Sequence, residues 1–125
     1  MRQGILPKGI VLFAHGSRDP EWARPFEGIA AALEKRGFVV RTAFLELMRP
    51  TLAEALADMV ALKVSSVRIV PVFLGAGAHV KQDLPRLVME ANPPVKVTID
   101  APIGEQAEVV EAIAGAIARG ARASP

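Results

Sequence analysis

The chain has 125 residues, of which 51% are hydrophobic and 22% are charged, a balance typical of one folded domain rather than a disordered chain. The absence of cysteine excludes disulfides and thiolate metal sites. The formal charge of +2 comes from scattered basic residues, without the basic stripe or stacking aromatics of nucleic-acid binding. No apolar stretch has the length of a membrane span or of a signal peptide, so we expect a cytoplasmic protein that binds neither membranes nor nucleic acid.

The sequence predicts one α/β domain over residues 1–125, with its core at about 9–119 and a frayed tail at 120–125. The first predicted strand, Gly9–Ala14, is continuously apolar, as in parallel sheets covered on both faces. A helix follows, with Ser17 or Asp19 as its N-cap and Gly37 after its last turn.

The middle of the chain continues the alternation of strands and helices. A strand is predicted at 39–45, and Thr51 with Glu54 forms a capping-box pattern for the next helix. The third strand is predicted at 66–74 in spite of Pro71, which cannot donate a hydrogen bond to the sheet.

The third predicted helix begins at Val80 or Asp83 and ends at Ala91, because Pro85 is tolerated in a helix only within the first turn. A fourth strand at 95–100 and a last helix at 106–119 complete the pattern.

This βαβαβαβα order predicts a four-stranded parallel sheet in the order 2-1-3-4, with helices on both faces. In that order the first and third strands are neighbours and the chain changes direction between them. Ligands of such sheets bind at the carboxyl ends of the strands, at this switch point.

The only two histidines of the chain fall at this predicted crevice. His15 follows the first strand directly, and His79 follows the third strand through a glycine-containing loop. A lone histidine is most often a surface or satisfied core residue. Two at one crevice predict a shared metal ion, since neutral imidazole is a common ligand of Fe, Co, Ni, Cu and Zn.

Glu46, after the second strand, is expected at the same rim. Its carboxylate would ligate the ion, neutralise it, or accept protons from a substrate, and the sequence alone leaves these roles open. It is equally compatible with a solvated loop residue.

Two other chemistries fit poorly. The stretch 75–80, GAGAHV, lacks the third glycine and the acidic partner of a dinucleotide-binding loop, so we expect no nucleotide. A strand followed by His-Gly also occurs in histidine phosphatases and α/β-hydrolases, but Ala14 stands where a phosphatase has arginine and there is no Gly-x-Ser-x-Gly elbow.

Three segments together resemble the small class II tetrapyrrole chelatases, the CbiX-type sirohydrochlorin cobaltochelatases, which are related to the sirohydrochlorin ferrochelatases. The segments are FAHGSRDP at 13–20, AFLE at 43–46 followed by PTL at 50–52, and PVFLGAGAHVKQDLP at 71–85. The similarity runs in order from about Gly9 to Ile117.

The resemblance implies insertion of Co²⁺ or Fe²⁺, with Ni²⁺ used by some members, into a sirohydrochlorin-type tetrapyrrole without nucleotide hydrolysis, in cobalamin or siroheme biosynthesis. It assigns metal binding to His15 and His79 and makes Glu46 the active-site carboxylate, with either a histidine or Glu46 removing the pyrrole protons. A non-catalytic carrier of tetrapyrrole or metal in the same cleft is the alternative.

Longer relatives contain two such half-domains, so the resemblance implies that this chain forms a homodimer. Sirohydrochlorin carries many carboxylates. Five residues lie near the predicted rim and are therefore candidates for binding the tetrapyrrole. These are Arg18, Arg49, Gly75, Gly77 and Lys81.

Overall fold

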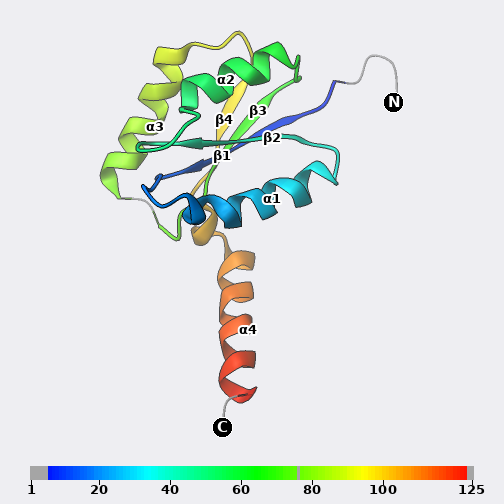
Figure 1. Cartoon of the computed structure of the whole chain (residues 1–125), viewed down its shortest axis with the longest axis vertical. Coiled ribbons are helices and arrows are strands. Elements are labelled where there is room, and N and C mark those ends of the chain that lie inside the picture. The colour runs from blue at the N-terminus through cyan, green and yellow to red at the C-terminus, as the bar shows by residue number, and fades with distance from the viewer. Residues whose placement is uncertain (1–5, 76, 124–125) are drawn as a thin grey trace.

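The computed structural model describes residues 6–75 and 77–123 and contains one four-stranded sheet in the order β2-β1-β3-β4 (Figure 1). All three pairings are parallel, which confirms the predicted topology. The strands are β1 (Gly9–Ala14), β2 (Val39–Phe44), β3 (Val67–Pro71) and β4 (Val97–Ile99).

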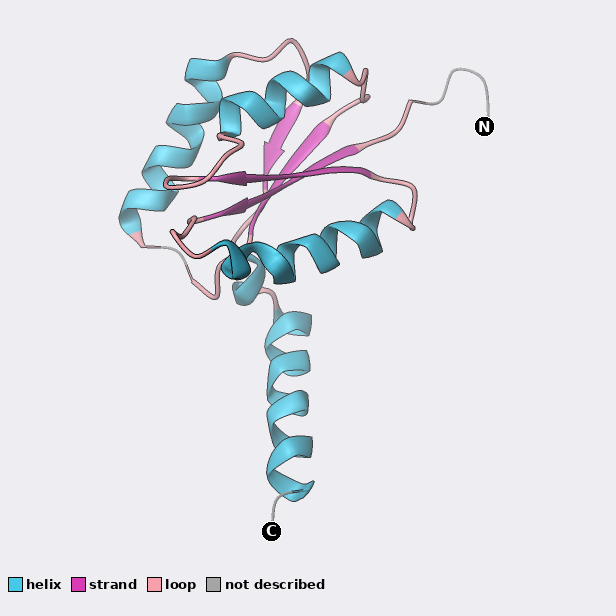
Figure 2. Cartoon of the chain, in the orientation of Figure 1, coloured by secondary structure: helices cyan, strands magenta, loops and turns pink. Residues whose placement is uncertain are grey.

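Helices lie on both faces of the sheet, as predicted (Figure 2). On one face, α2 (Leu52–Ala61) and α3 (Ala78–Ala91) cover the main core, in which Phe13, Leu56 and Ile69 are at most 1% exposed. On the other face, α1 (Arg24–Glu34) packs over a smaller cluster of apolar residues. The strand residues of this cluster alternate with those of the main core, because successive side chains point to opposite faces.

The N-caps predicted for the first two helices are present. Asp19 caps a 3-10 turn, η1 (Pro20–Ala23), by accepting a hydrogen bond from the amide of Glu21 at 3.0 Å. Thr51 and Glu54 form the full capping box of α2. Gly37, after α1, has a φ of +92°, a conformation that glycine adopts without strain.

Three strands are shorter than the sequence predicted. β3 ends at Pro71 rather than at residue 74, because proline has no N–H with which to extend the ladder. β2 ends at Phe44 and β4 covers only three residues. Of the residues left out of the strands, residue 45 and residues 72–74 follow β2 and β3 at the carboxyl end of the sheet.

The start predicted for α3 was wrong. The helix begins at Ala78, so Pro85 lies in its interior and His79 lies in its first turn. An interior proline leaves the carbonyl four residues earlier without its helical donor. Pro85 and Lys81 are both exposed, so water can reach that carbonyl.

The last helix, α4 (Ala107–Ala123), follows the short 3-10 helix η2 (Ile103–Glu105) and projects away from the sheet (Figure 1). It continues beyond Arg119, so residues 120–123 of the expected tail are helical, and 124–125 lie outside the described residues. Alanine and arginine favour helix strongly enough to carry it past Gly120. None of the described helices combines the length and hydropathy needed to cross a membrane.

Candidate active site at the carboxyl ends of the strands

His15 lies directly beyond β1 with an exposed side chain. Its imidazole packs against the ring of Phe73, with the ring centroids 4.8 Å apart and the planes tilted by 53°. Phe73 in turn contacts the buried Phe13 edge to face, at a centroid distance of 6.2 Å. A chain of aromatic contacts therefore leads from the core to the first histidine.

Glu46 reaches the same rim from the end of β2. Its main-chain amide donates a hydrogen bond to the carbonyl oxygen of His15 at 3.0 Å, one step beyond the bond from Leu45 to Ala14. The turn between these segments depends on Gly16, whose φ is +99° and whose added Cβ would lie only 1.8 Å from the Glu46 carbonyl oxygen. The Glu46 side chain itself is exposed.

His79 is the second residue of α3, and its side chain is exposed. The loop that leads to it contains Gly75 and Gly77, and Gly77 is the extended N-cap residue of the helix. Both glycines are exposed and have open space where a Cβ would be. The motif residue Ala76 lies outside the described residues.

The topology brings the three candidates to one rim, since β1 lies between β2 and β3 and all strands end on the same side. Within residues 6–75 and 77–123, no three histidine, aspartate or glutamate side chains gather as a ready-made metal site. The arrangement offers His15 and Glu46 on loops and His79 in the first turn of α3, all with exposed side chains.

The three predicted rim cations differ in their surroundings. The Arg49 guanidinium pairs with the Glu54 carboxylate, and the hydrogen bond from Arg49, with a further one from the Thr51 backbone, lowers the pKa of Glu54 from 4.5 to about 2. In the described part of the chain, Arg18 and Lys81 are exposed and form no salt bridge.

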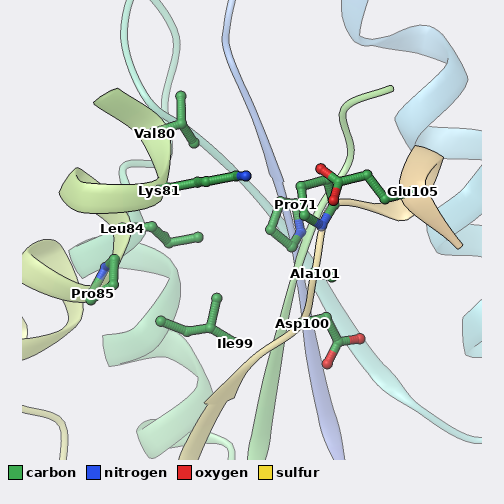
Figure 3. Close-up of a pocket in the computed structure, with 10 residues that line it drawn as sticks. Pro71, Val80, Lys81, Leu84, Pro85, Ile99, Asp100, Ala101 and Glu105 are labelled. Atoms are coloured by element: carbon green, nitrogen blue, oxygen red, sulfur yellow. The ribbon is translucent and has the colours of Figure 1, made fainter. Parts of the chain in front are cut away.

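Lys81 lines a pocket of about 370 Å³ between the start of α3 and the end of β4. Its side chain extends toward Pro71 and Glu105, with the apolar side chains of Leu84 and Ile99 below it in the view (Figure 3). This pocket adjoins the turn that carries His79, and its lining includes the carboxylates of Asp100 and Glu105 as well as the Lys81 ammonium group.

Two residues of the site were not singled out from the sequence. Gly16 follows His15 in the motif, but only the structure shows its approach to Glu46. Phe73 appeared to be part of a strand, and its contact with His15 depends on β3 ending two residues earlier. An aromatic residue just beyond a proline at a strand end was the available signal.

The CbiX family model matches residues 9–119. The chain belongs to the CbiX family. A curated relative, a sirohydrochlorin cobaltochelatase from Saccharolobus solfataricus, is 32% identical over 114 residues, which cover 84% of this chain and 89% of the relative. Another sirohydrochlorin cobaltochelatase, from Methanococcoides burtonii, is 36% identical over 97 residues, covering 74% of this chain and 73% of the relative.

Solved structures agree with this membership of the CbiX family. A CbiX protein from Marinobacter aquaeolei VT8 has a TM-score of 0.82 at 28% identity, covering 94% of this chain and all of that one. The sirohydrochlorin chelatase SirB from Bacillus subtilis subspecies spizizenii, in complex with cobalt, has a TM-score of 0.76 at 25% identity, covering 91% of this chain. The match covers 51% of SirB, so this chain spans about half of that protein's length.

Proposed function

We propose that this protein inserts Co²⁺ or Fe²⁺ into sirohydrochlorin, without nucleotide hydrolysis, in cobalamin or siroheme biosynthesis. The observation that carries the proposal is the placement of the two histidines in a CbiX-family fold: His15 directly follows β1, and His79 lies in the first turn of the helix that follows the neighbouring parallel strand β3. The relatives named sirohydrochlorin cobaltochelatase and the cobalt complex of SirB support the same chemistry. We place the reaction in the cytoplasm, the compartment expected from the sequence.

In this proposal His15 and His79 hold the substrate ion through neutral imidazole nitrogens. Imidazole suits Co²⁺, Fe²⁺ and Ni²⁺, and two such ligands leave most of the coordination sphere open for exchange. The ion then passes to the four pyrrole nitrogens of the macrocycle. Two pyrrole N–H protons leave as the metal–nitrogen bonds form, so the products are the metallated ring and two protons.

We assign proton removal to Glu46. Its side chain is exposed at the rim, and its backbone amide donates a hydrogen bond to the carbonyl oxygen of His15. A carboxylate held beside the ion can accept the departing protons and partly neutralise the charge of the ion.

The rim groups would bind the periphery of the tetrapyrrole. Arg18 and Lys81 have no salt-bridge partner in the described chain and could pair with the substrate's carboxylates, whereas Arg49 would share its guanidinium with Glu54. Gly75 and Gly77 leave the loop before His79 open for a flat ring to approach closely.

We also propose that the active form is a homodimer in which α4 of each chain packs on the other. Val109, Ile113 and Ile117 recur every four residues along α4 and so form one apolar stripe. None of the α4 residues is buried, and Ile117 is 67% exposed. Helices in proteins draw most of their stability from packing of an apolar face, so we expect this stripe to contact a partner surface.

A matching surface exists on the α1 face of the sheet. A groove of about 430 Å³ lies there, lined mainly by apolar residues of β1, β3 and α1 that include Leu12, Leu33 and Val70. Val109 in the first turn of α4 also lines this groove, whereas the rest of α4 projects away from the sheet (Figure 1). A second copy related by a twofold axis would place its own α4 against this face while receiving the first in return.

The proposed reaction is tested by mixing the protein anaerobically with sirohydrochlorin and excess Co²⁺, Fe²⁺ or Ni²⁺ and following the absorbance of the metallated ring. The proposal predicts many turnovers per protein, at a rate above that of the protein-free reaction, with at least one of these ions. Tight binding without acceleration would identify a carrier and contradict the chelatase.

A further inference from the structure

The ring of Phe73 is the one aromatic surface recorded against the His15 imidazole in the described chain. Phe73 is half-buried, whereas His15 is exposed. Because an exposed histidine on a loop samples several rotamers, a ring packed 4.8 Å from it restricts the directions in which its nitrogens can point.

The Phe73 backbone is itself held in place. Its carbonyl oxygen accepts a hydrogen bond from the amide of Gly104 in η2 at 2.9 Å. Gly104 sits so close to the chain that an added Cβ would lie 2.3 Å from the Cα of Leu74. The edge contact with Phe13 fixes the ring from the core side. Phe73 is therefore anchored at both its backbone and its ring.

We propose that Phe73 is a positioning residue that holds His15 in its metal-binding orientation. The proposal rests on the proposed function, in which His15 is a ligand of the substrate ion. A ligand that is already oriented loses less conformational entropy when it binds, so the ring raises metal affinity without touching the metal. The sequence places this ring between the third strand and the second histidine, so the segment that delivers His79 also orients His15.

The test is a titration of the metal-free protein with Co²⁺ alone, under anaerobic conditions, followed by the visible absorption of the bound ion. Phe73→Leu keeps an apolar side chain but removes the ring, and we expect it to weaken Co²⁺ binding about three- to tenfold, the size of an aromatic pair interaction. Phe73→Tyr retains the ring and should bind Co²⁺ like the unmodified protein.

Met59→Ala is the control for general destabilisation, because Met59 is fully buried beside Gly9 at the start of β1, the opposite end of that strand from His15, so its truncation disturbs the core without reaching the ring beside His15. It should lower the melting temperature at least as much as Phe73→Leu and leave Co²⁺ affinity unchanged. Equal losses of affinity in both variants would reduce Phe73 to a packing role and overturn the proposal.

A second readout is the NMR signal of the His15 ring protons, which a neighbouring aromatic ring displaces. Phe73→Leu should remove this displacement and Phe73→Tyr should keep it. His15→Ala separates the two levels of the argument. If His15→Ala weakens Co²⁺ binding and Phe73→Leu does not, the positioning role fails, and if His15→Ala has no effect, the metal assignment of the proposed function fails.

Discussion

The backbones of His15 and Glu46 are joined by a hydrogen bond, in which the Glu46 amide donates to the His15 carbonyl oxygen at 3.0 Å. This bond continues the pairing of β1 and β2 beyond the last ladder residues, Ala14 and Phe44. The backbones of the proposed metal ligand and the proposed proton acceptor are therefore linked directly, although 30 residues separate them in the sequence.

Gly16 is expected to be indispensable for this junction. Gly16→Ala places a Cβ 1.8 Å from the Glu46 carbonyl oxygen and requires a φ of +99°, so we expect a loss of stability of more than about 2 kcal/mol, as for a side chain in a strained conformation. Thermal or denaturant unfolding measures it.

Gly28→Ala is the control for that substitution. Gly28 lies within α1 and an added Cβ meets nothing within 4 Å, so alanine should be neutral or stabilise by about 0.5–1 kcal/mol. If Gly16→Ala unfolds at the same denaturant concentration as Gly28→Ala, the close approach of the two rim segments is not a constraint.

Glu46→Gln tests the role of the carboxylate with almost no change of shape. As a proton acceptor, Glu46 should support about 10²- to 10⁴-fold of the insertion rate, so kcat should fall by this amount while the Kd for Co²⁺ stays the same. Single-turnover kinetics together with the Co²⁺ titration measure both quantities. An unchanged kcat would remove Glu46 from catalysis, and a weakened Kd would make it a metal ligand instead.

Because Glu54 pairs with Arg49, we expect its carboxylate to stay ionised at a lower pH than an ordinary glutamate. The pKa of Glu54 is lowered to about 2, so its contribution to stability is complete above its ordinary value of 4.5 and is lost as the pH falls through about 2. Arg49→Met removes the largest cause and should raise the pKa of Glu54, leaving the weaker effect of the Thr51 backbone. A carboxyl ¹³C titration reads this directly, and identical titration curves would contradict the pairing.

The proposed exchange of α4 predicts that a charge in its apolar stripe separates the subunits. Ile113→Asp should shift the protein from dimer to monomer in light scattering, because burial of one isoleucine contributes about 1.5–3 kcal/mol and a carboxylate in the groove adds a desolvation cost. Ala118→Asp introduces the same charge on the other side of the helix and should leave the dimer intact. An unmodified protein that is an active monomer would show that α4 has no partner of this kind.

Much of the fold follows from local patterns in the sequence. The unbroken apolar run at β1 predicted a strand buried on both sides, and the spacing of Thr51 and Glu54 predicted the capping box of α2. Because the strands are parallel, their order alone placed His15, Glu46 and His79 at one rim.

The deviations depend on tertiary context. Pro85 is accommodated inside α3 because its face of the helix is open to water, which a propensity rule does not take into account. The direction of α4 depends on the surface against which its apolar stripe packs. The periodicity of apolar residues predicts that a helix forms, but it does not predict that surface. The contact between Phe73 and His15 joins residues far apart in the chain, and no local sequence pattern around either residue predicts it.

The central claim is that His15 and His79 together hold the ion that is inserted. Its most direct test is the initial rate of Co²⁺ insertion into sirohydrochlorin by the unmodified protein and by His15→Ala, His79→Ala and the double variant, each checked for folding by circular dichroism. We predict that each single substitution lowers the rate by more than about 100-fold, since even the outer partners of metal ligands contribute 10- to 100-fold. A folded double variant that inserts Co²⁺ as fast as the unmodified protein would contradict the claim.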